Sequence, residues 1–81
     1  MTDVVEFVDA IRAAHQRALA SGDKIFDVRD PGFNVFDHGD APEIRAVCRS
    51  LGIERLFYST FTMTFGLPGW QKSLGIRIRD V

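Results

Sequence analysis

Two stretches of the chain place apolar residues at the three- and four-residue spacing of an amphipathic helix. In the first stretch, one face of a helix would carry Val4, Val8, Ile11, His15 and Leu19. Asp3 and Glu6 form a capping-box pattern at its start, and Gly22 is placed to accept the left-handed conformation that often ends a helix. The pattern predicts a helix from Asp3 to about Ser21.

The second helical stretch is shorter. Asp40 and Glu43 repeat the capping-box pattern, with Pro42 in the first turn, where its missing N–H costs nothing. The apolar positions that follow, at i, i+3, i+4 and i+7, are Ile44, Val47, Cys48 and Leu51. Gly52 closes the predicted helix.

The remaining regular stretches favour strands. Residues 24–28 and 33–37 are β-branched and aromatic runs on either side of Asp30-Pro31-Gly32, where Pro fixes φ and Gly accepts a positive φ, so we expect a hairpin. Residues 56–65 alternate over their whole length and predict one long strand. Its first face would carry Phe57, Ser59, Phe61, Met63 and Phe65. After a loop at 66–70, residues 76–79 predict a last strand.

In this order the elements predict one α+β domain over residues 1–81, arranged αββαββ. We expect a mostly antiparallel sheet of about four strands with two helices packed on one face. The hydrophobic content of 46%, with seven Phe, excludes a disordered chain. If translation starts at Met1, we expect a complete small protein.

Composition also bears on location. No run approaches the roughly 18 apolar residues of a membrane helix, and the first residues are acidic where a signal peptide is basic. The single cysteine, Cys48, cannot form an internal disulfide. We therefore expect a cytoplasmic protein with no membrane partner.

Side chains that could perform chemistry have ordinary structural interpretations. We interpret His15 as a half-buried ring and Cys48 as a small buried hydrophobe. The serines lack a nucleophile elbow, and the glycines lack phosphate-loop spacing. His38 with Asp37 offers the start of a metal site, and hence a small metal-dependent enzyme as one alternative, but Asp40 is assigned to a helix cap. We expect no metal, no cofactor and no catalysis.

A net charge of −1 hides an asymmetry between the two halves of the chain. Residues 1–40 hold eight acids and four bases, whereas residues 41–81 hold six bases and three acids. Four of the acids flank the predicted hairpin: Asp27, Asp30, Asp37 and Asp40. Such a cluster can occupy a basic, nucleic-acid-binding groove by presenting charge as phosphates do. The alternative is that they are solvated turn residues and a helix cap.

Aromatic and basic residues suggest two further kinds of contact. Tyr58 on the exposed face of the long strand and Trp70 in the following loop favour an interface, for which a two-fold homodimer is the commonest arrangement. Arg55, Arg77 and Arg79, together with Tyr58, favour a second alternative, a small nucleic-acid-binding module. The negative net charge argues against it, and arginines that keep a strand edge soluble are the simpler interpretation.

In length, order of elements and charge the chain resembles the small inhibitors that phages make against host machines, anti-CRISPR proteins among them. The resemblance extends over the whole chain and rests on no motif. It implies blockade of a nucleoprotein complex, by covering its DNA-binding groove or by locking its subunits. We therefore expect a non-catalytic inhibitor that binds another protein or nucleoprotein complex by occlusion. The expected contact residues are Asp27, Asp30, Asp37, Tyr58 and Trp70.

Overall fold

The computed structural model describes residues 2–59, 61–70 and 77–80, and only the backbone of Tyr58 and of residues 77–80. Its elements are α1 (Val4–Ser21), β1 (Ile25–Arg29), α2 (Val35–His38), α3 (Pro42–Ser50), β2 (Arg55–Ser59), β3 (Thr62–Gly66) and β4 (Arg77–Asp80). They form a small α+β domain with an antiparallel sheet, as predicted, although the elements follow one another in a different order from αββαββ.

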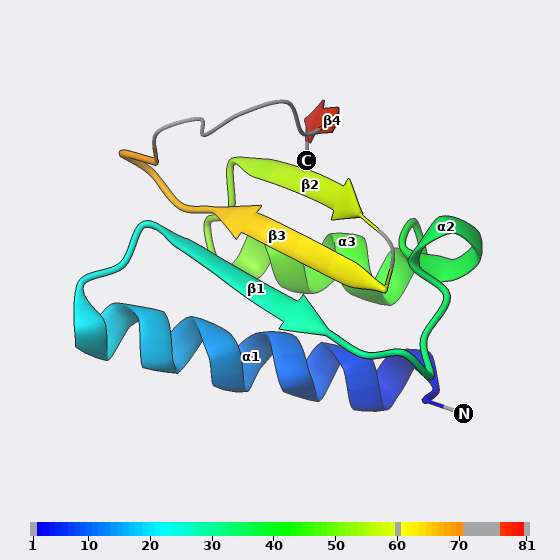
Figure 1. The fold of residues 1–81 in the computed structure, drawn as a ribbon. Coiled ribbons are helices and arrows are strands. Elements are labelled where there is room, and N and C mark those ends of the chain that lie inside the picture. The colour runs from blue at the N-terminus through cyan, green and yellow to red at the C-terminus, as the bar shows by residue number, and fades with distance from the viewer. Residues whose placement is uncertain (1, 60, 71–76, 81) are drawn as a thin grey trace.

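The sheet is built around β3. β1 and β2 pair with its two sides in antiparallel fashion, and β4 pairs with β2, so the strand order is β1-β3-β2-β4. α1 and α3 cover the same face of the sheet (Figure 1). Within the described residues, no helix combines the length and the apolar character needed to cross a membrane.

The two long helices form where the periodicity predicts them. The Asp3 carboxylate accepts the Glu6 N–H at 2.8 Å and caps α1, and Gly22, with φ 75°, ends it. The start of α3 differs from expectation, because Ala41 is the N-cap residue and makes no side-chain bond, while Asp40 forms an ion pair with Arg45 at 3.3 Å. Pro42 still occupies the first turn.

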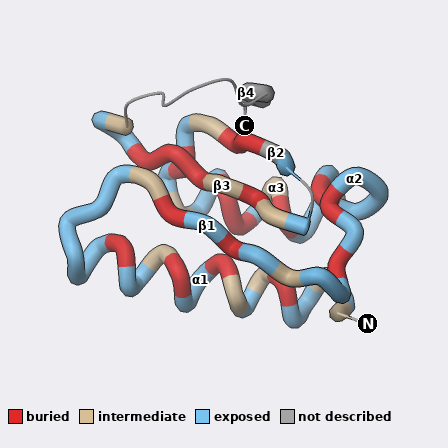
Figure 2. The backbone as a smooth tube through the Cα atoms, in the orientation of Figure 1, coloured by how far each residue is buried: buried red, intermediate tan, exposed pale blue. Residues whose placement is uncertain are grey.

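The core lies between the helices and the sheet, where buried positions face inward from both layers (Figure 2). The largest fully buried side chains are Phe7, Ile11, Phe33, Ile44, Met63 and Phe65. Phe26 and Phe65, cross-strand partners on β1 and β3, stack with ring centroids 5.0 Å apart. Burying an aromatic or aliphatic side chain of this size contributes about 1.5–3 kcal/mol, so this cluster dominates the stability of so small a domain.

The predicted hairpin over residues 24–37 is wrong in its second half. β1 is present, and the Phe33 N–H donates to the Asp30 carbonyl oxygen at 3.0 Å, so the chain does turn there. It then enters α2 instead of a strand. Asn34 caps this helix by accepting the N–H groups of Phe36 and Asp37 at 3.0 and 3.2 Å. A local side-chain cap of this kind competes directly with strand pairing.

The single strand predicted over residues 56–65 is also wrong. The segment is a hairpin in which Ser59 pairs with Thr62, so that two residues connect β2 to β3. In one continuous strand, Phe57 and Phe65 would lie on the same face. With a two-residue connection, Phe57 instead pairs with Thr64 and shares a face with it. Met63 and Phe65 therefore face the helices, whereas Phe57 lies on the opposite face.

Phe57 is nevertheless buried, at 3% exposure. Its ring meets the ring of Trp70 edge to face, with centroids 5.4 Å apart. Trp70 also lies directly over Gly66, where a Cβ, if one were present, would come within 3.0 Å of the indole Cγ. A small aromatic cluster thus covers this end of the outer sheet face, and glycine at position 66 makes the close approach possible.

Candidate functional site

The predicted acidic contact residues have separate structural roles. Asp27 lies on the exposed outer face of β1, where its carboxylate accepts a hydrogen bond at 2.7 Å from the hydroxyl of Thr64, its cross-strand partner. Asp27 is therefore part of the sheet surface and points away from the face covered by α1 and α3.

Asp30 anchors the start of the chain to the loop after β1. Its carboxylate accepts the Thr2 hydroxyl at 2.6 Å and the Gly32 N–H at 2.8 Å. These two bonds lower the pKa of Asp30 because they stabilise the ionised form, and the bond from Thr2 has the larger effect. A Cβ at Gly32 would lie only 3.1 Å from the Thr2 hydroxyl oxygen, so this glycine is required for close approach and not for a positive φ.

Asp37 belongs to the short helix α2. Its carboxylate accepts the Asn34 side-chain N–H at 2.9 Å, while Asn34 in turn accepts the Asp37 backbone N–H. The pair closes one helical turn on itself and fixes the direction of the residues between them. One of those residues is Phe36.

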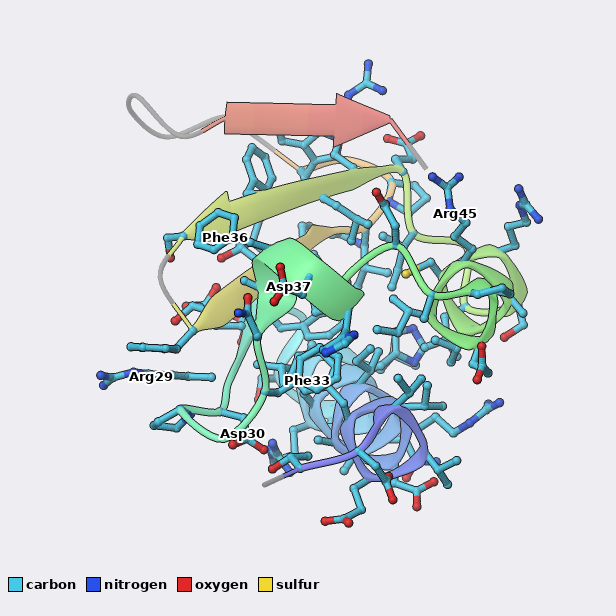
Figure 3. All side chains as sticks on the ribbon, turned by 90° about the vertical axis from the view of Figure 1, so that its right-hand side faces the viewer. Arg29, Asp30, Phe33, Phe36, Asp37 and Arg45 are labelled. Atoms are coloured by element: carbon cyan, nitrogen blue, oxygen red, sulfur yellow. The ribbon has the colours of Figure 1, made fainter. Side chains whose placement is uncertain are left out.

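Asp30 and Asp37 lie at the same end of the molecule as two exposed aromatic rings. Phe36 on α2 is 69% exposed, and Phe61, between β2 and β3, is 42% exposed. The Asp30 N–H donates to the Phe61 carbonyl oxygen at 2.9 Å, which joins the loop after β1 to the β2–β3 connection. Figure 3 looks onto this end, with Phe36 and Asp37 on α2 above Asp30. We call these four residues, Asp30, Phe36, Asp37 and Phe61, the α2-end surface.

Trp70 is remote from this surface. It packs on Gly66, the last residue of β3, whereas Phe61 immediately precedes the first. The length of β3, whose course Figure 1 shows, therefore separates the two aromatic residues. Tyr58 pairs with Met63 and Arg77 in the backbone register, and its side chain lies outside the described residues. The five predicted contact residues therefore do not form one surface.

The basic residues of the nucleic-acid alternative lie on β2 and β4. In the register, Arg79 is opposite Leu56 and Arg77 is opposite Tyr58, while Arg55 is opposite Asp80. The side chains of Arg77 and Arg79 lie outside the described part of the chain, so the backbone register alone places these residues.

The side chains considered for chemistry lie beside aromatic rings or within the hydrophobic core. His38 is exposed and lies beside Phe33, with ring centroids 6.0 Å apart. Over the described residues, no three His, Cys, Asp or Glu side chains gather as metal ligands would. The partly buried ring of His15 packs edge to face against Phe26, as predicted. Cys48 is fully buried, and this burial raises the pKa of its thiol to about 11.

Sequence reasoning missed both exposed aromatic residues. It placed Phe61 inside a strand because Ser59-Thr60-Phe61-Thr62 contains none of the Gly or Asn residues that mark a two-residue turn. For Phe36 a signal was present. Asn34, followed three residues later by Asp37, fits a capped helical turn, which would have replaced the second strand of the predicted hairpin.

Comparison with known proteins adds no relative: no protein-family model, curated protein or solved structure matches this chain.

Proposed function

We propose that this protein is a non-catalytic binding protein that covers a surface of a partner macromolecule with its α2-end surface. The observation that carries the proposal is the exposure of Phe36. A phenylalanine that is 69% exposed contributes little to folding. The turn that presents it is nevertheless ordered by three hydrogen bonds between Asn34 and the residues after it.

The composition of the α2-end surface supports a protein-binding role. Protein interfaces combine aromatic anchors, which lose their water on binding, with a polar rim that fixes orientation. Phe36 and Phe61 are suited to be the anchors, and Asp30 and Asp37 the rim. Both carboxylates are held by hydrogen bonds, so little side-chain freedom is lost when they meet a basic partner.

The resemblance to phage inhibitors suggests a more specific partner. We propose a host nucleoprotein complex, with Asp30 and Asp37 occupying a basic groove in place of phosphates and the aromatic rings packing beside them. The action is then occlusion in the cytoplasm, without chemistry. A homodimer remains a further prediction, which sedimentation velocity at several protein concentrations would test.

The experiment compares Phe36→Ala with Leu19→Ala, a control on α1 where the side chain is 61% exposed. Each protein is expressed in cells whose CRISPR–Cas system targets a phage, and the efficiency of plaquing is measured over a panel of such systems. We expect the wild-type protein and Leu19→Ala to restore plaquing equally. Phe36→Ala should weaken binding to the inhibited complex by about 30-fold, the effect of losing a 2 kcal/mol hot spot.

Two results would count against the proposal. Restoration of plaquing by Phe36→Ala at the wild-type level would remove the α2-end surface from it. If no CRISPR–Cas system is inhibited, the proposed nucleoprotein partner is wrong. Binding by the α2-end surface is then tested alone, by recovery of a partner from cell extract with wild-type protein but not with Phe36→Ala. A low-salt gel shift with random DNA and RNA tests the nucleic-acid alternative, since non-specific binders show affinities of about 10⁻⁴–10⁻⁶ M even at physiological salt.

A further inference from the structure

The open edge of β1 has the hydrogen-bonding pattern needed to accept another strand. Lys24 and Asp30 bond towards β3, since the Lys24 carbonyl oxygen accepts the Leu67 N–H at 2.8 Å and the Asp30 N–H donates to Phe61. Hydrogen-bonded positions alternate along an antiparallel pair. The backbone N–H and C=O groups of Ile25, Asp27 and Arg29 therefore point to the other side, where the described residues provide no strand.

This edge borders a shallow cavity of about 280 Å³ between β1 and α1. α1 runs along β1 on the side away from β3 (Figure 1). On the α1 side the cavity is lined by Ala10, Ala13, Ala14 and Arg17, and on the β1 side by Asp27, Val28 and Arg29. An added strand lies about 4.8 Å from its neighbour, and the short alanine side chains leave room for its inward-facing residues.

We propose that this groove binds an extended acidic peptide segment of a partner protein, which adds to the sheet as a strand beside β1. Backbone groups of the peptide pair with Ile25, Asp27 and Arg29, as in other cases of strand addition. The acidic preference follows from the charges along the groove. Among the residues that line the cavity, the exposed Arg17 and Arg29 supply two positive charges against the one negative charge of Asp27. Arg29 extends away from the protein body (Figure 3) and can reach a carboxylate on the added strand.

A second copy of this chain fits the edge less well than a bare peptide. Two-fold pairing of two β1 strands would bring both α1 helices to the same face of the joined sheet. Each α1 already runs along the open edge (Figure 1), so the two helices would compete for one space. The binding surface is also distinct from the α2-end surface, and the inference does not depend on the function proposed above.

The test uses two capped heptapeptides, one alternating valine with glutamate and the other alternating valine with lysine. Each is titrated into isotope-labelled protein, and amide resonances are followed by NMR. We expect the glutamate peptide to shift the amides of Ile25, Asp27 and Arg29 and to slow their hydrogen exchange. The lysine peptide should bind several-fold more weakly, and the difference should shrink at high salt, because exposed charges are screened.

Two variants separate the charge contribution from the backbone contribution. Arg17→Glu combined with Arg29→Glu changes only exposed side chains, and should weaken the glutamate peptide by about fivefold for each arginine and favour the lysine peptide. Asp27→Pro removes one outward N–H from the edge and should abolish binding of both peptides. Asp27→Ala, the matched control, retains that N–H and should bind the glutamate peptide at least as tightly as wild type.

Three results would overturn the proposal. They are the absence of shifts with millimolar glutamate peptide, equal affinity for the two peptides in low salt, and shifts centred away from β1 and α1. A protein that sediments as a dimer broken by Asp27→Pro would instead assign the edge to a second copy and would equally reject the peptide. If Asp27→Pro fails to fold, the double arginine variant still decides the outcome.

Discussion

Phe33 and Phe36 are the same residue type, three positions apart, in opposite environments. Phe33 is 1% exposed and stacks on Phe7, with ring centroids 4.1 Å apart and planes inclined by 10°. Phe36 is 69% exposed on α2. Replacement of each by alanine is therefore a matched test of whether the α2 segment is folded as described.

The expected costs follow from burial. Removing a fully buried phenylalanine costs about 3–5 kcal/mol, through lost burial and the cavity left behind, and the ring stack on Phe7 favours the upper part of this range. For Phe36 only about a third of the side chain is out of water. A third of the roughly 1.5–3 kcal/mol for full burial gives about 0.5–1 kcal/mol. We therefore expect Phe33→Ala to cost at least about 2 kcal/mol more than Phe36→Ala.

Urea unfolding followed by circular dichroism measures both free energies of unfolding. Because the whole domain is stable by only about 4–12 kcal/mol, Phe33→Ala can be partly unfolded in buffer. Phe33→Leu then supplies a milder variant, with a smaller expected loss than Phe33→Ala, because leucine retains more of the buried apolar volume. Equal losses for the two alanine variants, or a larger loss for Phe36→Ala, would refute the placement of α2.

Three further predictions concern local interactions. Thr2→Val should reduce the loss of stability below about pH 4, and urea midpoints from pH 6 to pH 3 measure this. The bond from Thr2 lowers the folded-state pKa of Asp30, which contributes stability that is present above the unfolded-state pKa and is lost as the pH falls through the folded-state pKa. Asn34→Ala should cost about 1 kcal/mol, and Asn34→Ser should cost much less, since a serine hydroxyl also caps and adds no charge beside Asp37; near-equal unfolding midpoints for the two variants would count against the cap. The buried Cys48 thiol, with its pKa raised to about 11, should resist iodoacetamide at pH 8 until urea unfolds the protein, and rapid labelling of folded protein would contradict its burial.

The sequence predicts the two long helices well because their signals are local and repeated. Apolar spacing and the end signals Asp3 and Gly22 all agree over α1, and each acts within a few residues. The strands are harder to predict. Residues 56–65 alternate without a turn signal, and only the pairing of β2 with β3 in the folded sheet shows that Ser59 and Thr62 face each other. A connection of two residues changes the face on which Phe57 lies, and no local sequence pattern indicates this change.

The two aspartates of the candidate site were predicted from the sequence, whereas its two exposed phenylalanines and the surface as a whole were not. The preference of aspartate for turns and helix starts correctly suggests structural roles for Asp30 and Asp37. Whether Trp70 lies near these aspartates depends on the end of the sheet at which each loop lies. Phe61 directly precedes β3 and Trp70 packs on Gly66 at the other end of this strand, so the length of β3 separates them, and the sequence alone did not show where β3 begins.

Phe61 has φ 60°, in a region where residues with a Cβ are disfavoured. Holding a bulky residue there costs on the order of 1–3 kcal/mol, and glycine would relieve this strain. The connection between β2 and β3 thus loses stability through this strain while it holds a phenylalanine that is 42% exposed. Phe61→Gly should raise the melting temperature and impair whatever activity depends on that ring, as expected of a residue that serves function at the expense of stability.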